Sequence, residues 1–293
     1  MRRLGQVLRE QYGEKVYKLT LSSGCSCPNR DGRIGTGGCS FCSAGGSGDF
    51  AAAFAPIEQQ LEEAKERIRP KTDAKKFIAY FQAFTNTYGD PGRLEPLYEE
   101  VLRREKIVAL SLGTRPDCLG EEIMAMLRRL QRIRPVWLEL GLQTVHEKTA
   151  RRIRRGYELP VFEESYYRLK REGFPVIVHL IFSLPGESRE DMLESVRYLA
   201  ALDPPPDGVK LQMLHVLRGT ALGGEYLRQP FPLLSLEDYA ELIAESAAIL
   251  PEETVFHRVT GDGPGKLLIA PDWTRNKKRV LNTINARLRE MGE

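Results

Sequence analysis

Four of the five cysteines lie within one short stretch of the chain, at positions 25, 27, 39 and 42. The spacing is C-x-C-x11-C-x2-C, and the C-x2-C pair stands in a glycine-rich frame, GTGGCSFCSAGG. Two cysteines separated by two residues can present both thiolates to one metal site through a tight turn, and glycines permit such turns. Crowded cysteines in a reducing compartment indicate metal binding rather than disulfides. The spacing leaves open an iron–sulfur cluster held by three cysteines, a zinc site that uses all four, and ordinary small core residues.

Several polar residues follow or interrupt apolar runs that are typical of buried strands. Gln82 and Asn86 follow the run FIAYF, where a plain loop is the alternative interpretation. Glu139, Lys210 and Arg258 stand within or at the end of other such runs. A buried charge is costly unless it is paired, so we slightly favour a structural Glu139–Lys210 pair over a substrate contact. These five residues are the candidates for the substrate side of a site.

Short apolar runs and amphipathic stretches alternate along the chain and would position these residues. The apolar runs predict six strands, at 16–21, 77–81, 107–112, 136–142, 176–182 and 209–214, with 254–259 as a further candidate. Helical spacing recurs at 57–68, 94–104, 121–132, 147–153, 161–172, 189–201, 236–250 and 276–291. Six consecutive β-then-α units imply parallel strands with right-handed crossovers. A barrel and a doubly wound open sheet both fit, and in either fold ligands gather at the carboxyl ends of the strands.

The composition is that of a folded chain large enough for one large domain. It has 293 residues, of which 42% are hydrophobic and 28% charged, and its 43 basic and 40 acidic side chains nearly cancel. These values exclude a disordered chain, a collagen-like chain and a small disulfide scaffold. The most apolar stretch, 175–185, is too short for a bilayer, so we expect no membrane partner. Residues 1–18 contain no hydrophobic block, so we expect no secretory signal and a cytoplasmic location.

The stretch CPNRDGRIGTGGCSFC, residues 27–42, resembles the cluster loop of radical S-adenosylmethionine enzymes, in the branch related to the catalytic subunit of elongator. That branch has a longer gap between its first two cluster cysteines than most of the superfamily. Five further segments of this chain resemble motifs that follow strands in the same branch. They are SLGTRPDCL (111–119), LELGLQT (138–144), HLIFSLPGES (179–188), KLQMLHVLRGT (210–220) and FHRVTGDGP (256–264). The resemblance covers most of residues 16–264. It is strongest to a bacterial family of about this length that lacks elongator's acetyltransferase-like domain.

This resemblance implies a partial parallel (β/α)6 barrel of radical S-adenosylmethionine type over residues 1–250, with the cluster loop at 22–48 and a basic C-terminal extension at 251–293. It also implies a 4Fe–4S cluster held by Cys27, Cys39 and Cys42. One iron is then left open for S-adenosylmethionine, whose reductive cleavage yields a 5′-deoxyadenosyl radical. The family pattern does not include Cys25, which we interpret as a bystander. We interpret Cys118 as a buried or neighbouring thiol rather than a ligand.

Related enzymes contact the cofactor from residues at the strand ends. The resemblance implies the same role for Phe41, Gln143, Arg155 and His179. Arg155 would pair with the cofactor carboxylate through a bidentate fork, whereas a core role is the alternative for His179. The turn at 184–187 would pass over the adenine, although this chain has Ser183 where relatives usually carry glycine. The Gly-Gly motif of other radical enzymes is absent from 82–88, so the contact to the cofactor amino group stays unassigned.

Positive charge is concentrated near the end of the chain. Residues 276–293 hold five basic side chains against two acidic ones, an excess equal to the net +3 of the whole chain. Such clusters can follow phosphates, although a solvated surface is an equally good interpretation. Elongator's catalytic subunit modifies wobble uridines of tRNA, so the resemblance implies a tRNA base as substrate and an electron donor of the flavodoxin or ferredoxin type. The alternatives are radical modification of a small metabolite or protein side chain, and a non-enzymatic four-cysteine zinc module that binds RNA.

Overall fold

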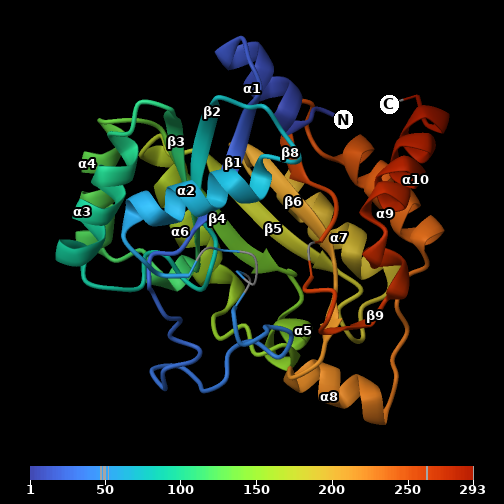
Figure 1. The fold of residues 1–293 in the computed structure, drawn as a ribbon. Helices are drawn as coiled ribbons and strands as arrows, with labels where there is room; N and C mark the ends of the chain where they lie inside the picture. Colours follow the sequence, from blue (N-terminus) through green and yellow to red (C-terminus); the bar gives the residue numbers. More distant parts are fainter. Residues whose placement is uncertain (47, 49–50, 52, 262, 293) are drawn as a thin grey trace.

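Seven parallel strands form one curled sheet in the computed structural model, which describes residues 1–46, 48, 51, 53–261 and 263–292 (Figure 1). The strand order is β1-β2-β3-β4-β5-β6-β8. Their bounds are β1 (Val16–Leu21), β2 (Lys76–Phe81), β3 (Ile107–Thr114), β4 (Val136–Gln143), β5 (Val176–Phe182), β6 (Gly208–Met213) and β8 (Val255–Arg258). The predicted partial barrel is therefore confirmed, and the run at 254–259 joins it as a seventh strand beside β6.

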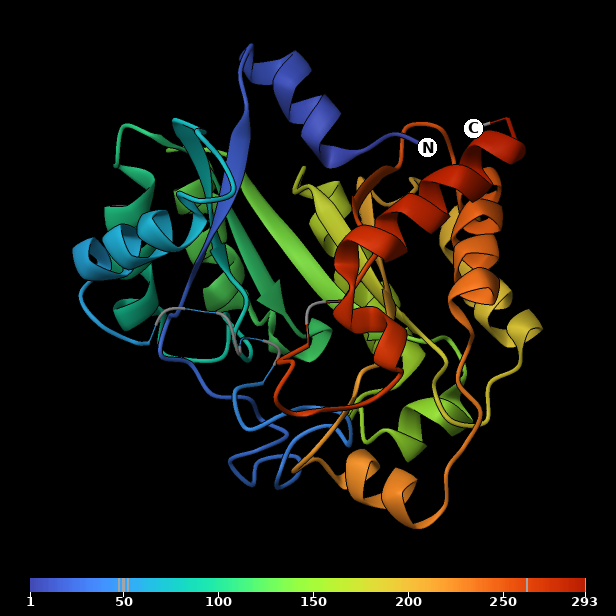
Figure 2. The same cartoon turned by 45° about the vertical axis from the view of Figure 1, so that its right-hand side comes forward.

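Most of the helices cover the outer face of this sheet, as Figures 1 and 2 show from two sides, whereas α1 and α8 lie at its opposite ends. Their bounds are α1 (Leu4–Tyr12), α2 (Ile57–Ile68), α3 (Pro91–Leu102), α4 (Glu121–Gln131), α5 (Glu147–Arg152), α6 (Leu159–Arg171), α7 (Arg189–Ala200), α8 (Ala221–Arg228), α9 (Leu236–Ile249) and α10 (Lys277–Glu290). The fold also contains two short 3-10 helices, η1 (Pro116–Cys118) and η2 (Asp272–Arg275). A separate antiparallel pair is formed by β7 (Val216–Leu217) and β9 (Leu268–Ala270). Helices α1 and α8 lie where the sequence pattern predicts none.

Strand residues alternate between an outer face toward the helices and an inner face toward the barrel interior. Leu112 and Leu140 are typical of the outer face, where they are fully buried in the main hydrophobic core. The inner face is apolar at the amino ends of the strands, where Leu8 of α1 packs with Val16 and Ile78. Helix α1 thus covers the end of the barrel opposite the long loop that follows β1 (Figure 1).

Residues 251–293, predicted as an extension, supply β8 to the sheet and helix α10, which packs against α9 (Figure 2). Ser47 in the predicted cluster loop, and Asp262 and Glu293 in the predicted extension, lie outside the described residues. The predicted boundary at residue 250 stays a prediction. In the described part of the chain, every helix is too short or too polar to cross a membrane.

Replacing Leu112 tests the outer core. Leu112→Ala should lower the free energy of unfolding by about 2–5 kcal/mol, because the surrounding helices cannot fill the cavity left behind. Leu227 is 59% exposed, so the matched control Leu227→Ala should change it by less than about 0.5 kcal/mol. Denaturant unfolding of the three proteins measures both values. Equal losses from the two variants would contradict the burial of Leu112.

Candidate active site at the carboxyl edge of the sheet

The loop after β1 carries three cysteines to a cavity at the carboxyl ends of the strands. The cavity has a volume of about 140 Å³ and is lined by Cys27, Cys39 and Cys42 together with residues that end β2, β3, β4 and β6. The C-x2-C turn is closed by a hydrogen bond from the Cys42 amide to the Cys39 carbonyl, 3.0 Å long. Gly38 approaches so closely that a Cβ there would lie 2.8 Å from Nε of Arg30. Glycine thus lets the loop fold tightly around its cysteines.

The surroundings of the loop favour the thiolate form of one of these cysteines, Cys39. The hydrogen bond from Cys42 lowers the pKa of Cys39 to about 7, and the positive charge of Arg115 and a hydrogen bond from Asn29 assist. The pKa of Cys42 is raised well above its usual value because it donates that hydrogen bond and is buried. A thiolate is the form that binds metal, so the loop environment favours one ligand in its reactive state.

The number of cysteines at the cavity distinguishes two kinds of metal site. A structural zinc ion is held by four protein ligands arranged as a tetrahedron. Cys27, Cys39 and Cys42 line the cavity, whereas Cys25 and Cys118 do not. A cubane cluster places its thiolates on different irons and can leave one iron without a protein ligand. Three cysteines therefore fit an iron–sulfur cluster better than a four-cysteine zinc site.

The two other cysteines point elsewhere. Cys25 is buried in the main core, where its Sγ accepts a hydrogen bond from Arg93 of α3 at 3.4 Å. It does not line the cavity. Cys118 lies in η1, where burial and then the charge of Asp117 raise its pKa to about 12. Cys118 therefore stays protonated at neutral pH and is a poor metal ligand.

All four residues predicted to contact the cofactor line the cavity: Phe41, Gln143, Arg155 and His179. Gln143 ends β4 with a positive φ of 70°, and its Nε2 would lie 2.6 Å from a Cβ on Gly141. Glycine at 141 therefore allows the Gln143 side chain to fold over the strand end. Ser183 also has a positive φ, 64°, which glycine adopts without strain. The backbone at Ser183 thus has the conformation for which the resemblance implies a glycine.

Arg155 is held mainly by the protein itself. Its guanidinium donates to the carbonyl oxygens of Leu142, Thr144 and Tyr157 and to Oε1 of Glu147, at 2.7–3.1 Å. These four bonds leave one of five N–H donors for a ligand. The bidentate contact expected with a cofactor carboxylate would first have to break one of them. Arg155 thus ties the end of β4 to α5.

Sequence reasoning missed two arginines beside the cysteines. Arg115 is 8% exposed, donates two hydrogen bonds to Asp117 and one to the Arg155 carbonyl, and lines the cavity. Burial disfavours its charge, but Asp117 outweighs this and raises the pKa of Arg115. Arg30 donates to the Ser43 carbonyl. Arg115 follows β3 in the string SLGTRPDCL, so its position at a strand end could have identified it as a candidate site residue.

A buried carboxylate lies at the floor of the cavity. Glu139 is 1% exposed and accepts hydrogen bonds from Ser111 and Lys18 at 2.7 Å, from His179 at 2.9 Å, and from Lys210. Burial alone would raise its pKa, but Lys18 and Lys210 hold it well below the usual value. Burial and the charge of Lys210 lower the pKa of His179 to about 4, so the ring is neutral at pH 7.

The five substrate candidates lie in four different places. Gln82 and Glu139 line the cavity, and Lys210 lies behind it, bonded to Glu139 and to the Tyr80 hydroxyl. Arg258 lines a second, larger cavity. Asn86 lies outside both, fully buried, with its amide bonded to Ser23 and to the carbonyls of Phe81 and Gly113. Asn86 therefore fixes the strand ends rather than facing a ligand.

Two residues of the network, Lys18 and Tyr80, were absent from the sequence candidates. Lys18 shares the inner face of β1 with Val16 and Thr20, and its Nζ lies 4.6 Å from the Tyr80 ring centroid. The alternation in VYKLTL placed Lys18 opposite the outward Leu19 and Leu21. The alternation therefore indicated a lysine on the inner face of the first strand, and this could have identified Lys18 as a candidate site residue.

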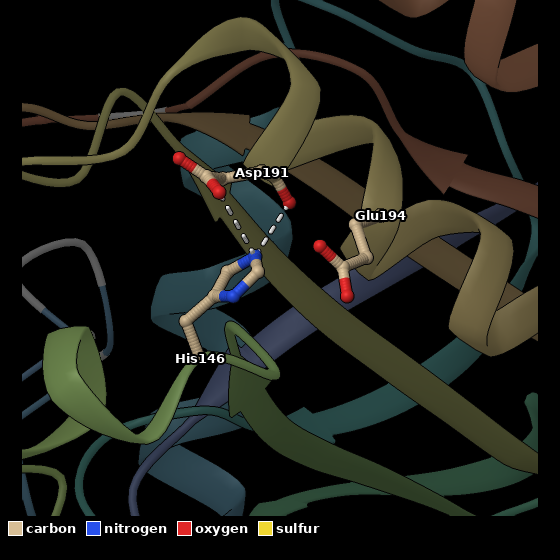
Figure 3. Close-up of side chains that lie close together, drawn as sticks. All are labelled: His146, Asp191 and Glu194. Carbon is tan, nitrogen blue, oxygen red and sulfur yellow. Dashed lines mark hydrogen bonds and ion pairs between the residues drawn. The ribbon is translucent and has the colours of Figure 1, made fainter.

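Within the part of the chain that the structure describes, one group of three side chains has its metal-ligating atoms close together: His146, Asp191 and Glu194 (Figure 3). Nε2 of His146 is 2.9 Å from the main-chain carbonyl of Asp191, to which it donates. The Asp191 carboxylate accepts from the amide and hydroxyl of Ser188 in the capping box of α7. The bond from His146, the N-cap of α5, joins that helix to α7, and the Asp191 carboxylate is engaged in the cap of α7, so we interpret this pair as structural.

The neutral state of His179 predicts a pH effect. Its folded-state pKa of about 4 lies below the ordinary 6.5, so the folded protein binds fewer protons and loses stability as pH falls from 6.5 toward 4. At pH 5 this loss amounts to about 2 kcal/mol, and it should be missing from His179→Gln. Denaturant unfolding of parent and variant at pH 8 and pH 5 measures the difference. Identical losses would refute the buried neutral histidine.

Comparison with known proteins agrees with this architecture. Residues 29–199 match the Radical SAM superfamily, and residues 206–290 match the Radical_SAM C-terminal domain. Protein YtqA of Bacillus subtilis is 42% identical over 97% of this chain and 88% of its own length. Protein YhcC of Escherichia coli K12 is 35% identical over 98% and 92%. Human Elongator complex protein 3 is 32% identical over 59% of this chain and 32% of its own length.

Solved structures share the fold at low sequence identity. The archaeal Elp3 of Methanocaldococcus infernus superposes with a TM-score of 0.68 at 17% identity, over 93% of this chain and 63% of that one. Coproporphyrinogen III oxidase (HemN) of Escherichia coli gives 0.54 at 16% identity, over 83% and 54%. The family match covers more than half of the chain and the resemblance to elongator is confirmed, so the chain belongs to the Radical SAM superfamily of enzymes.

Proposed function

We propose that this enzyme uses a 4Fe–4S cluster and S-adenosylmethionine to modify a tRNA base, at a wobble uridine. The use of a cluster and S-adenosylmethionine is supported by the different positions of the four cysteines in the loop after β1. Cys27, Cys39 and Cys42 meet at the cavity, whereas Cys25 is bonded to Arg93 in the core. Three thiolates leave one iron of a cubane without a protein ligand, which is the condition for binding a small molecule there.

Cys27, Cys39 and Cys42 would hold the cluster, and their common place on one cavity and the depressed pKa of Cys39 fit that role. When bound, the cluster and S-adenosylmethionine supply reductive cleavage of the sulfonium to a 5′-deoxyadenosyl radical. The charges of Arg115 and Arg30 act on the Cys39 thiol and stabilise its anionic form.

The remaining residues of the cavity restrict water and orient the substrate. Phe41 packs against an apolar group that contains Ile153, Ile181 and Leu184, which gives one dry wall. Gln143 and Gln82 offer amide donors and acceptors on the same cavity. Glu139 is saturated with hydrogen bonds and holds the floor in place. This arrangement suits the protection of a reactive intermediate.

The choice of tRNA rests on the relationship to elongator's catalytic subunit and on the basic end of the chain. A flavodoxin or ferredoxin type donor would supply the electron. Because three cysteines must stay reduced to bind iron, we also propose a cytoplasmic location. Radical modification of a small metabolite or protein side chain is the second candidate, since the cavity of about 140 Å³ would also fit a small group.

Serine replacement tests the ligand assignment. Cys27→Ser, Cys39→Ser and Cys42→Ser should each lose most iron and acid-labile sulfide after anaerobic purification, because each removes one cluster ligand. Cys25→Ser is the matched control from the same loop and should keep the parent content. Iron lost from Cys25→Ser, or zinc in place of iron in the parent, would contradict the assignment.

Deleting the gene tests the substrate. Modified nucleosides of bulk tRNA should differ between the deletion strain and its parent at one uridine-derived species, and Cys39→Ser should fail to restore it. Mass spectrometry of digested tRNA measures the change. Purified enzyme should also bind tRNA with an affinity that falls as salt rises. Unchanged nucleosides together with no salt-dependent binding would exclude tRNA and favour the second candidate.

A further inference from the structure

A second cavity, of about 1050 Å³, opens on the side of the sheet between β1 and β8. Among the described residues its lining contains no aspartate or glutamate. It contains nine lysines and arginines: Arg3, Arg9, Lys15, Lys18, Arg67, Lys71, Arg258, Arg275 and Lys277. Tyr80 and Gln82 line both this cavity and the one at the cysteines, so the two adjoin inside the barrel. A group that entered from the open side would reach the cysteine cavity along a basic wall.

Lys18 stands at the junction of the two cavities. Its side chain is 18% exposed, and it makes one hydrogen bond, to Oε1 of Glu139, although an ammonium group has three donors. Its Nζ lies 4.6 Å from the ring centroid of Tyr80 and 5.6 Å from that of Trp137. These aromatic faces hold the ammonium in place while its other N–H groups stay available to the cavity.

The charges around Lys18 do not balance. Among the described residues, Glu139 is the one carboxylate that bonds to both Lys18 and Lys210, so a single carboxylate serves two lysines. Burial lowers the pKa of Lys18, and the positive charge of Arg258 lowers it further. Concentrated cations in a partly dry site are stabilised by an anionic ligand. The site thus favours a substrate that brings a negative charge.

We propose that Lys18 is an anion-binding residue, which docks an anionic group of the substrate where the two cavities meet. The group is an oxyanion, either a carboxylate on the reacting base or a phosphate of its nucleotide, because both accept hydrogen bonds from an ammonium. This inference rests on the proposed function in one respect, namely that the substrate reacts in the cysteine cavity.

Trp137 provides a direct reporter of this site. The chain has two tryptophans, so the variant Trp273→Phe leaves Trp137 as the single indole, beside Lys18. Sodium phosphate and sodium acetate are titrated into this protein at constant ionic strength, with sodium chloride as the reference. We expect a saturable change in Trp137 emission with at least one of the two oxyanions. Phosphate alone would identify a nucleotide phosphate as the group, and acetate alone a carboxylate.

Substitutions at Lys18 complete the test. Lys18→Met in the same background should weaken the apparent affinity by about tenfold or more, because a charged hydrogen bond is lost. Lys18→Arg should retain binding and shows that a charge at this position is sufficient. Lys71→Met is the matched control, since Lys71 lines the same cavity but is exposed at its mouth. Glu139 keeps Lys210, His179 and Ser111 in Lys18→Met, so the variant retains a neutralised carboxylate.

Two results would overturn the proposal: no response of Trp137 beyond the chloride reference, or equal affinities in the Trp273→Phe protein and its Lys18→Met derivative. The titration needs no cluster, no S-adenosylmethionine and no tRNA. A negative result would therefore leave the proposed radical chemistry standing, and loss of the tRNA proposal would leave the anion site standing.

Discussion

The interior of this fold is organised by the need to neutralise one buried carboxylate. Glu139 lies on β4, and its partners Lys18 and Lys210 lie on β1 and β6. In a flat sheet, β1 would lie three strand spacings from β4, or about 14 Å, which exceeds the reach of a lysine side chain. The sheet must therefore curl until β1 and β6 both approach Glu139. The same curl brings the carboxyl ends of the strands together around one cavity.

That convergence explains the composition of the strand ends. Gly113 and Gly141 line the cavity on neighbouring strands, and a Cβ at Gly141 would lie 2.6 Å from Nε2 of Gln143. Phe84, Gln143 and Ser183 follow or end strands with positive φ values of 60–70°. Such conformations are costly for residues other than glycine and are concentrated at functional sites. The strained positions and the cysteine loop thus occupy the same edge of the sheet.

The sequence predicted the six principal strands and the cysteine cavity well, because periodicity reports which face of an element is apolar and the cysteine spacing reports a local turn. It also predicted the Glu139–Lys210 pair. It did not predict Lys18 as a second partner, because alternation assigns Lys18 to the inner face without saying which residue it meets across the barrel. Helix α1 was missed because its apolar positions pack on a barrel end that exists only after the sheet has curled.

For residues at the strand ends, the sequence does not show which side chains face the cavity and which are bonded to the protein. Gln143 and Asn86 both follow strands in the sequence, yet Gln143 lines the cavity whereas Asn86 is bonded to the backbone of β2 and β3. Arg155 matches a family position, but four of its N–H groups are bonded to protein acceptors. Position in a motif identifies the neighbourhood of a side chain, and the hydrogen bonds determine how much of it is left for a ligand.

The central claim is that three cysteines at one edge of the barrel leave an iron free for S-adenosylmethionine. Its most direct test is the release of 5′-deoxyadenosine from S-adenosylmethionine by the anaerobically reconstituted, dithionite-reduced enzyme. Our account predicts that this product forms and that its formation requires the reductant. A fully loaded, reduced enzyme that leaves S-adenosylmethionine intact would contradict it.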